Sequence, residues 1–211
     1  SRVEASAHAL ASTVDVSVSI GTKIVAALVN YSGEIPSFVS VSDLEGLVSD
    51  LSDNGPSKFV MYGKTAATAV TTSSAVTIEV SRIVARVKLG QVINALTGPY
   101  EGEEIQVSGA YLINVAGEAA LGESSVVTSK WYNKQKNCSE LPSLLNAGTP
   151  MNFYCYPNLV SSDSSSKDWS PRFTRLVVEA VIAGETWYYP INLPLIKSNC
   201  SYEIPSLTIT R

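Results

Sequence analysis

The longest regular pattern of apolar and polar positions in the 211-residue chain runs from Thr77 to Leu89. Its second half alternates strictly: one side carries Ile83, Ala85, Val87 and Leu89, and the other carries Arg82, Val84, Arg86 and Lys88. Period-two alternation with many β-branched residues predicts a half-buried strand, here about twice the usual length or more. A strand this long in the middle of a chain can belong to two packed units. We therefore predict two β-sandwich domains, residues 1–90 and 91–211, that share this segment.

Three stretches complete the predicted first domain. In the stretch Val14–Ile20 every second residue is apolar, which predicts a strand whose inner face carries Val14, Val16, Val18 and Ile20. Lys23–Asn30 is apolar on both faces, which is typical of a central strand covered on each side. Ser42 and Glu45 fit a capping box, and the apolar spacing that follows predicts one helix over residues 43–53.

The second half of the chain favours further strands. Ile105–Val115 is predicted to turn one set of side chains inward: Ile105, Val107, Tyr111, Ile113 and Val115. Asn152–Pro157 predicts a short aromatic strand, and Tyr202–Arg211 predicts an edge strand because Pro205 interrupts it. The fold class we expect is all-β with one short helix.

A hairpin is predicted between Thr174 and Leu193. Its two strands flank Gly184-Glu185, a glycine-first pair that suits a type II′ turn. Alternation along the second strand turns three side chains toward the core: Trp187, Tyr189 and Ile191.

Composition and charge exclude several classes of function. Hydrophobic residues make up 45% of the chain and charged residues 16%, which indicates an ordered globular protein. A net charge of −4 without charge blocks provides no basic footprint for nucleic acid or anionic lipid. The longest apolar run, Ile24–Val29, is far shorter than the roughly 20 residues that cross a bilayer. We expect membrane contact only through a lipid anchor outside this chain.

Candidate catalytic and metal-binding residues are few. His8 is the one histidine, so a hydrolase triad or an activated cysteine nucleophile would have to use it. The three cysteines, Cys138, Cys155 and Cys200, lack paired metal-ligand spacing, and a structural thiol or a disulfide such as Cys138–Cys155 is favoured over a nucleophile. The carboxylates Glu101, Glu103 and Glu104 lie in one glycine-rich loop, which is typical of a solvated turn, and Asp163 with Asp168 does not form a calcium loop. We therefore expect no enzyme activity, catalytic residue, cofactor or metal.

Aromatic residues suggest one alternative, a carbohydrate-binding module. A sugar platform would draw on Trp131, Tyr132, Trp169, Trp187, Tyr188 and Tyr189. Aromatic side chains in β-sandwiches more often fill the core or its rim. A sugar site remains the runner-up hypothesis.

Several segments, in order, resemble the fimbrillin family of Bacteroides-type bacteria, the type V pilins. The first half contributes Gly21–Asn30, the capped helix with Lys58–Gly63, and Val80–Leu89. The second half contributes Tyr111–Gly117, Phe153–Asn158, Trp187–Pro194 and Tyr202–Arg211. Each segment is weak alone, but together they span almost the whole chain in the order of the family.

The resemblance implies two transthyretin-like β-sandwich domains in a lipoprotein precursor, exported through the periplasm to the outer membrane. It implies a structural subunit of a surface fimbria that supports cell adhesion, with a fimbrial tip adhesin as the alternative. Subunits of this family join head-to-tail by donor-strand exchange after a trypsin-like protease removes the first strand. The expected partners are other fimbrial subunits, with the homopolymer favoured, and surface ligands of host or bacterial cells.

Six residues are the predicted polymerisation edges: Val14, Val16, Val18, Ile20, Leu207 and Ile209. Family members carry a further strand before the position of Val14 and another segment after the last strand. In this chain only thirteen residues precede Val14, and Arg211 is the last residue. Because Arg2 and Arg211 are basic, we expect them to be processing positions for a trypsin-like protease.

Overall fold

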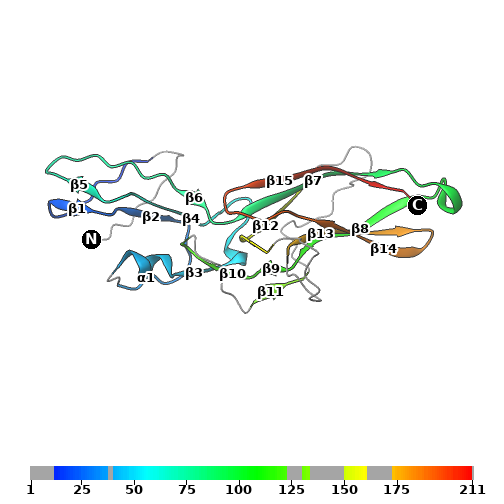
Figure 1. The fold of residues 1–211 in the computed structure, drawn as a ribbon, viewed down its shortest axis with the longest axis horizontal. Helices are drawn as coiled ribbons and strands as arrows, with labels where there is room; N and C mark the ends of the chain where they lie inside the picture. Colours follow the sequence, from blue (N-terminus) through cyan, green and yellow to red (C-terminus); the bar gives the residue numbers. More distant parts are fainter. Residues whose placement is uncertain (1–11, 38–39, 123–129, 134–149, 161–172, 211) are drawn as a thin grey trace.

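The structure is a computed structural model that describes residues 12–37, 40–122, 130–133, 150–160 and 173–210. Within these ranges the protein is all-β with one short α-helix, which confirms the predicted fold class. None of the helices in this part of the chain has the length and apolar character needed to cross a membrane. The sheets form an elongated molecule with early strands at one end and late strands at the other (Figure 1).

The N-terminal end consists of residues 12–82 and holds two small sheets, a third that it shares with the second half of the chain, and the helix. Antiparallel strands form the pair β1-β5 and the three-stranded sheet β2-β4-β6. Strand β3 pairs with β10, which belongs to the second half of the sequence. The bounds are β1 Gly21–Lys23, β2 Ala26–Val29, α1 Val41–Glu45, β3 Val48–Asp50, the 3-10 turn η1 Leu51–Asp53, β4 Met61–Lys64, β5 Thr68–Val70 and β6 Ser81–Arg82.

The C-terminal end consists of two three-stranded sheets, β12-β7-β15 and β14-β13-β8. The sheets lie one above the other in Figure 1, and buried side chains from both belong to one hydrophobic cluster. A further antiparallel pair, β9-β11, lies nearer the middle of the molecule. The bounds are β7 Ala85–Asn94, the 3-10 turn η2 Gly98–Tyr100, β8 Ile105–Ile113, β9 Val115–Ala116, β10 Glu118–Ala120, β11 Trp131–Tyr132, β12 Met151–Cys155, β13 Arg175–Ile182, β14 Glu185–Asn192 and β15 Ser201–Ile209.

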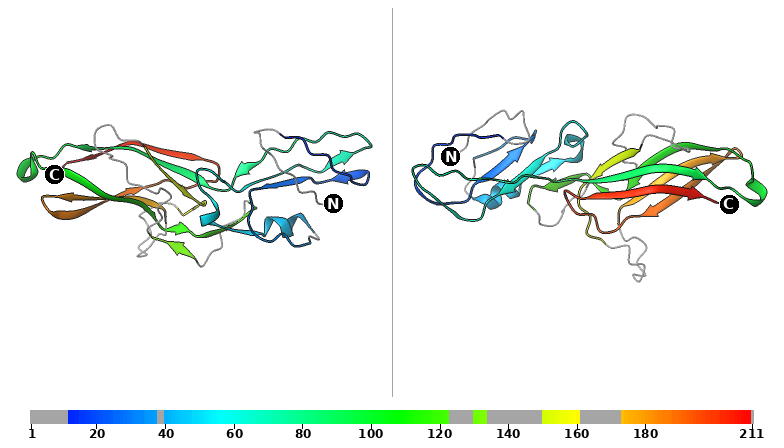
Figure 2. Two further views of the ribbon diagram at one scale, coloured as in Figure 1. Left: turned by 180° about the vertical axis from the view of Figure 1, so that it is seen from behind. Right: turned by 90° about the horizontal axis from the view of Figure 1, so that it is seen from above.

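The central segment passes from one end of the molecule to the other (Figure 2). The chain leaves β6, which pairs with β4, and after Ile83 and Val84 enters β7, which lies between β12 and β15. Val84 is buried although alternation places it outside, because the chain changes sheets at this point. The predicted boundary between residues 90 and 91 lies inside β7, and β10 returns to pair with β3.

The predicted helix over 43–53 is wrong in its extent. The capping box is formed two residues earlier: Ser40 Oγ accepts from Asp43 N at 3.2 Å, and Asp43 Oδ2 accepts from Ser40 N at 2.8 Å. The helix ends at Glu45, and Val48–Asp50 becomes a strand through its ladder with Glu118–Ala120. Tertiary pairing outweighs local helix propensity here.

The predicted inner face of Ile105–Val115 is right for its start and shifts afterwards. In the ladder of β8 with β13, Val107 faces Ala180 while Gly109 faces Glu179, so Ser108 is an extra residue on β8. Such a bulge reverses the phase of alternation. Beyond it, Ala110 and Leu112 are fully buried and Ile113 is half-exposed, while Tyr111 and Val115 are buried as predicted.

The hairpin Thr174–Leu193 is confirmed, but its turn lies one residue earlier than predicted. Ile182 pairs with Glu185, so the loop is Ala183-Gly184. Both residues have positive φ, +50° and +81°, which fits a type I′ turn instead of type II′.

Candidate assembly surface at the N-terminal end

The segment Val14–Ile20 belongs to no sheet among the described strands, so the prediction of a paired strand is wrong for the isolated chain. Its alternating apolar side chains are largely exposed: Val14 46%, Val16 44%, Val18 44% and Ile20 67%. None of its backbone groups bonds to another described residue, and one side-chain contact holds it, from Lys23 Nζ to Ser19 Oγ at 3.0 Å. Covering the exposed half of four such side chains would contribute about 3–6 kcal/mol.

The rest of the N-terminal end also lacks a closed core. No described residue in 12–48 or 61–82 is fully buried, and Ile24 and Val48 are about half exposed. The fully buried Leu51 and Val60 of this end lie at the junction, where their backbones bond to Gly117 and Ile83. Strand β2 was predicted as a central strand, but it pairs only with β4 and all four of its residues are half-buried. A three-stranded sheet of this length has too little facing structure to exclude water.

The C-terminal end is closed by comparison. Val87, Leu89, Leu112, Phe153 and Leu176 have no exposed surface. Its edge strands β14 and β15 each contain a proline, Pro190 and Pro205. Proline cannot donate a ladder hydrogen bond, so it protects these two of the four sheet edges from further pairing, while the edge strands β8 and β12 contain no proline. The six strands of the N-terminal end contain no proline, so the two ends differ mainly in their cores, which are closed at the C-terminal end and incomplete at the N-terminal end.

The other predicted edge residues, Leu207 and Ile209, lie in β15. This strand pairs in parallel with β7, where Leu207 lies opposite Val92 and Ile209 opposite Asn94. Ile209 is 1% exposed and Leu207 is half-buried, so both side chains pack in the core of their own chain. The sequence pattern does not bring them together with Val14–Ile20, because β15 ends at the far end of the molecule (Figure 1). Arg2 and Arg211, the predicted processing positions, lie outside the described residues.

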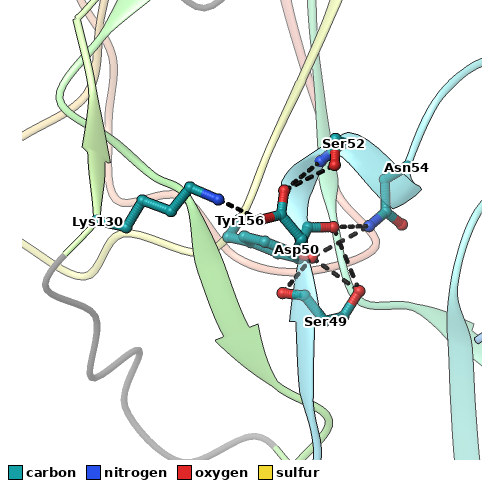
Figure 3. A network of polar contacts seen from close by, with 6 residues as sticks. All are labelled: Ser49, Asp50, Ser52, Asn54, Lys130 and Tyr156. Atoms are coloured by element: carbon teal, nitrogen blue, oxygen red, sulfur yellow. Dashed lines mark hydrogen bonds and ion pairs between the residues drawn. The ribbon is translucent and has the colours of Figure 1, made fainter. Parts of the chain in front are cut away.

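A buried polar network joins the two ends of the molecule (Figure 3). Tyr156, which follows β12, donates its hydroxyl to the carbonyl oxygen of Ser49 at 2.9 Å and accepts from Asn54 Nδ2 at 3.1 Å. Asn54 Oδ1 in turn accepts from the backbone N–H of Val60 at 2.9 Å. Burial raises the pKa of Tyr156, so it remains a donor over the physiological range.

Asp50 forms the outer part of the same network. Its carboxylate accepts from Ser52 N at 2.9 Å, from Ser52 Oγ at 2.8 Å, and from the Lys130 ammonium. The Lys130 hydrogen bond lowers the pKa of Asp50, and the same contact raises the pKa of Lys130. The pair is therefore ionised, and it ties β3 to the strand pair β9-β11. The sequence analysis did not predict this network, because Tyr156 lies 102 residues from Asn54 and 107 from Ser49 in the sequence.

Other candidate residues do not form a reactive site in the described part of the chain. Cys155 is fully buried and its pKa is raised to about 12 by burial, while Cys200 is exposed. The loop carboxylates Glu101, Glu103 and Glu104 are exposed. Among described side chains, no three His, Cys, Asp or Glu residues lie close enough to hold a metal ion. The candidates His8, Cys138, Asp163 and Asp168 lie outside the described residues.

The described aromatic residues that were predicted to form a sugar platform do not lie on one surface. On β14, Trp187 and Tyr189 face the core, whereas Tyr188 lies on the opposite face and is 58% exposed. Trp187 packs edge-on against Tyr100 with ring centroids 6.5 Å apart. Trp131 and Tyr132 lie on β11, in a different sheet. Trp169 lies outside the described residues.

No protein-family model and no curated protein matches the sequence. Solved structures with a similar fold include a putative cell adhesion protein from Bacteroides eggerthii, at 15% identity and a TM-score of 0.61, covering 89% of this chain and 68% of that one. A putative cell adhesion protein from Parabacteroides distasonis matches at 15% identity and a TM-score of 0.58, covering 90% and 68%. A fimbrilin from Porphyromonas gingivalis matches at 15% identity and a TM-score of 0.57, covering 82% and 64%. The chain therefore has the fimbrillin-like all-β fold that these proteins share, as its sequence predicts.

Proposed function

We propose that this chain is a structural subunit of a bacterial surface fimbria that assembles head-to-tail by donor-strand exchange. The observation that carries the proposal is the Val14–Ile20 segment, which has the pattern of a strand, no backbone partner among described residues and four exposed apolar side chains. An unpaired strand with an apolar face is a template for a strand from another molecule. The similar folds of a fimbrilin and of cell adhesion proteins support this role.

The two ends of the molecule suit a head-to-tail contact. Strand addition is favoured at the N-terminal end, where the core is incomplete, and β15 with Leu207 and Ile209 runs to the opposite end (Figure 1). A contact between unlike surfaces of identical subunits repeats and forms a filament. In this proposal a terminal strand of the next subunit pairs along Val14–Ile20 and covers its apolar face. We further propose that the two ends are transthyretin-like domains that meet at Ile83 and Val84.

The remaining parts of the proposal concern the cell. The subunit is exported through the periplasm as a lipoprotein precursor, and a trypsin-like protease activates it at the outer membrane. Arg2 and Arg211 are the proposed processing positions. The partners are other subunits of the same fimbria, and the assembled filament supports adhesion.

The test uses the precursor, activated with a trypsin-like protease, and compares substitutions on the two faces of one segment. The double variant Val16→Asp with Val18→Asp places charge on the apolar face, while Ser17→Asp places charge on the opposite face. Because residues 16–18 are exposed in the free chain, the free energy of unfolding of the monomer should change by less than about 0.5 kcal/mol in either variant. Electron microscopy and size-exclusion chromatography should show filaments with wild type and Ser17→Asp and only monomers with the valine variant. Equal assembly of all three, or no assembly of activated wild type, would refute the proposal.

A further inference from the structure

The outer face of the sheet β12-β7-β15 carries a compact group of polar side chains. Along β7, Val87 and Leu89 are buried, so Arg86 and Lys88 lie on the outer face. The ladder places Tyr154 of β12 and Ser201 of β15 on either side of Arg86. In the next row, Asn152 and Glu203 lie on either side of Lys88.

Aromatic contacts extend this face toward the N-terminal end. Tyr154 packs edge-on against Phe59, with ring centroids 4.9 Å apart. The guanidinium of Arg82, on β6, lies 5.3 Å from the centroid of the Phe59 ring. We call the surface formed by Phe59, Arg82, Arg86, Lys88, Asn152, Tyr154 and Glu203 the cationic face.

The charge of the cationic face is opposite to that of the chain. It has three cations and one carboxylate, and Glu203 is the one acidic residue on the four strands that build it, β6, β7, β12 and β15. The net charge of the chain is −4. A local excess of positive charge on an acidic protein favours an anionic partner.

The cations are already oriented in the free protein. Arg86 donates to Ser201 Oγ at 3.1 Å and to Glu203 Oε1 at 3.2 Å, and Lys88 Nζ lies 3.6 Å from Glu203 Oε2. These pairs are solvent-exposed, with side-chain exposure of 33–51%, so they are weak and exchange readily with another carboxylate. A guanidinium held beside an ammonium fits the planar, two-oxygen shape of a carboxylate.

The remaining groups indicate a partner with hydroxyl groups. The amide oxygen of Asn152 has no hydrogen-bond donor among the described residues, although it is covered. The oxygen itself is out of reach of a ligand, but the Asn152 side chain as a whole is partly exposed beside Lys88, where its amide N–H groups can donate to a ligand hydroxyl. Tyr154 is also partly exposed beside Arg86, so a phenol ring and an amide flank the two cations.

We propose that the cationic face binds carboxylate-bearing carbohydrate, such as uronic acid polymers. The Arg86 and Lys88 side chains bind the carboxylate in competition with Glu203, and Asn152 with Tyr154 contacts the hydroxyl-bearing ring. This goes beyond assembly, because it uses a sheet face of the monomer and no strand edge.

The experiment measures binding of the monomeric chain to polygalacturonate by biolayer interferometry at low salt, with dextran as the neutral control and poly-glutamate as the anionic peptide control. Wild type should bind polygalacturonate and not dextran. The double variant Arg86→Gln with Lys88→Gln should bind about four- to twenty-five-fold more weakly, at roughly two- to fivefold for each exposed charge. Glu203→Gln should bind about two- to fivefold more tightly, because it removes the competing carboxylate.

Lys23→Gln is the matched control, because it removes one positive charge at the other end of the molecule. It should leave binding unchanged. Binding that is weakened equally by Lys23→Gln would show a general charge effect and overturn the proposal. Binding that is unchanged in the Arg86/Lys88 variant would show that the cationic face is not the binding site and would also overturn it. Stronger binding to poly-glutamate than to polygalacturonate would assign the face to an acidic peptide and also overturn it. Because monomers are used, failure here leaves filament assembly untouched, and failure of assembly leaves this binding untouched.

Discussion

Replacing Tyr156 by phenylalanine tests whether the polar network in Figure 3 holds the two ends of the molecule together. The ring is 1% exposed, and the substitution removes one oxygen atom while it leaves the packing of the ring in place. The hydroxyl donates to the Ser49 carbonyl at 2.9 Å and accepts from Asn54 Nδ2 at 3.1 Å. After the change, Asn54 Nδ2 retains only a long contact of 3.4 Å to the Asp50 carbonyl.

The magnitude follows from these contacts. Each lost hydrogen bond contributes about 1 kcal/mol net, and a buried donor left with a poor partner costs more than the bond itself. We therefore expect Tyr156→Phe to lower the free energy of unfolding by about 2–3 kcal/mol. For a chain of this size each kcal/mol shifts the melting temperature by about 2–4 °C, so the expected shift is about 4–12 °C.

The assay is urea and thermal unfolding followed by far-UV circular dichroism and by tryptophan fluorescence. Tyr188→Phe is the control, because Tyr188 is exposed and its side chain makes no hydrogen bond to a described residue. It should change the free energy of unfolding by less than about 0.5 kcal/mol. A loss below about 0.5 kcal/mol for Tyr156→Phe as well would show that the network does not stabilise the junction.

Three further predictions concern charge, thiols and a turn. Lys130→Gln should lower the melting temperature at pH 7 and have no effect at acid pH. The pKa of Asp50 is lowered in the folded state, so the stabilisation of the fold by the Asp50–Lys130 pair is present above the usual pKa of 3.8 and is lost as pH falls through the folded-state pKa. An equal effect at pH 2 would contradict this. Iodoacetamide at pH 8 should modify Cys200 and leave Cys155 unmodified in peptide mass spectra until urea unfolds the chain, since Cys155 is buried with a pKa of about 12; modification of Cys155 in the native chain would disprove that burial. Ala183→Asn should raise the free energy of unfolding by about 0.5–1 kcal/mol, because Ala183 has a φ of +50° in a type I′ turn; a neutral or negative change would mean that the turn has another type.

Local patterns predicted those elements whose partners lie nearby in the sequence. The hairpin Thr174–Leu193 needs only a two-residue turn and matching alternation, so its strands were found and only the turn type was missed. The strand predicted over Thr77–Leu89 is only partly right, because the chain leaves strand conformation at Ile83 and Val84 and β7 runs from Ala85 to Asn94. Its alternation was recognised between Ala85 and Leu89 because one face of β7 packs in the core and the other is partly exposed.

Elements that depend on distant partners could not be predicted. Val48–Asp50 has the apolar spacing of a helix end, and its strand exists only because Glu118–Ala120 lies beside it. The bulge at Ser108 in β8 was not predicted, although the adjacent Gly109 is a residue type common at bulges, and it brings Ala110 and Leu112 into the core.

In the candidate assembly surface, the strand pattern was predicted from the sequence but the partner of the strand was not. The sequence pattern identifies Val14–Ile20 as strand-like, and the same four apolar residues prove to be exposed. Alternating apolar residues indicate that a strand packs against a partner, but they do not indicate whether that partner belongs to the same molecule. Leu207 and Ile209 have the same kind of pattern and find their partner, β7, within the chain.

The parallel pairing of β7 with β15 has a mechanical consequence. Ile83 and Val84 connect β6 to β7 directly, so tension applied to the N-terminal end reaches the start of β7, while tension at the opposite end reaches the last residues of β15. The two strands run in the same direction and are pulled from opposite ends. The hydrogen bonds that join β15 to β7 along Ser201–Ile209 are therefore loaded in shear. In that geometry the bonds must break together instead of one after another. We expect the unit to resist stretching along its long axis far better than peeling from its side.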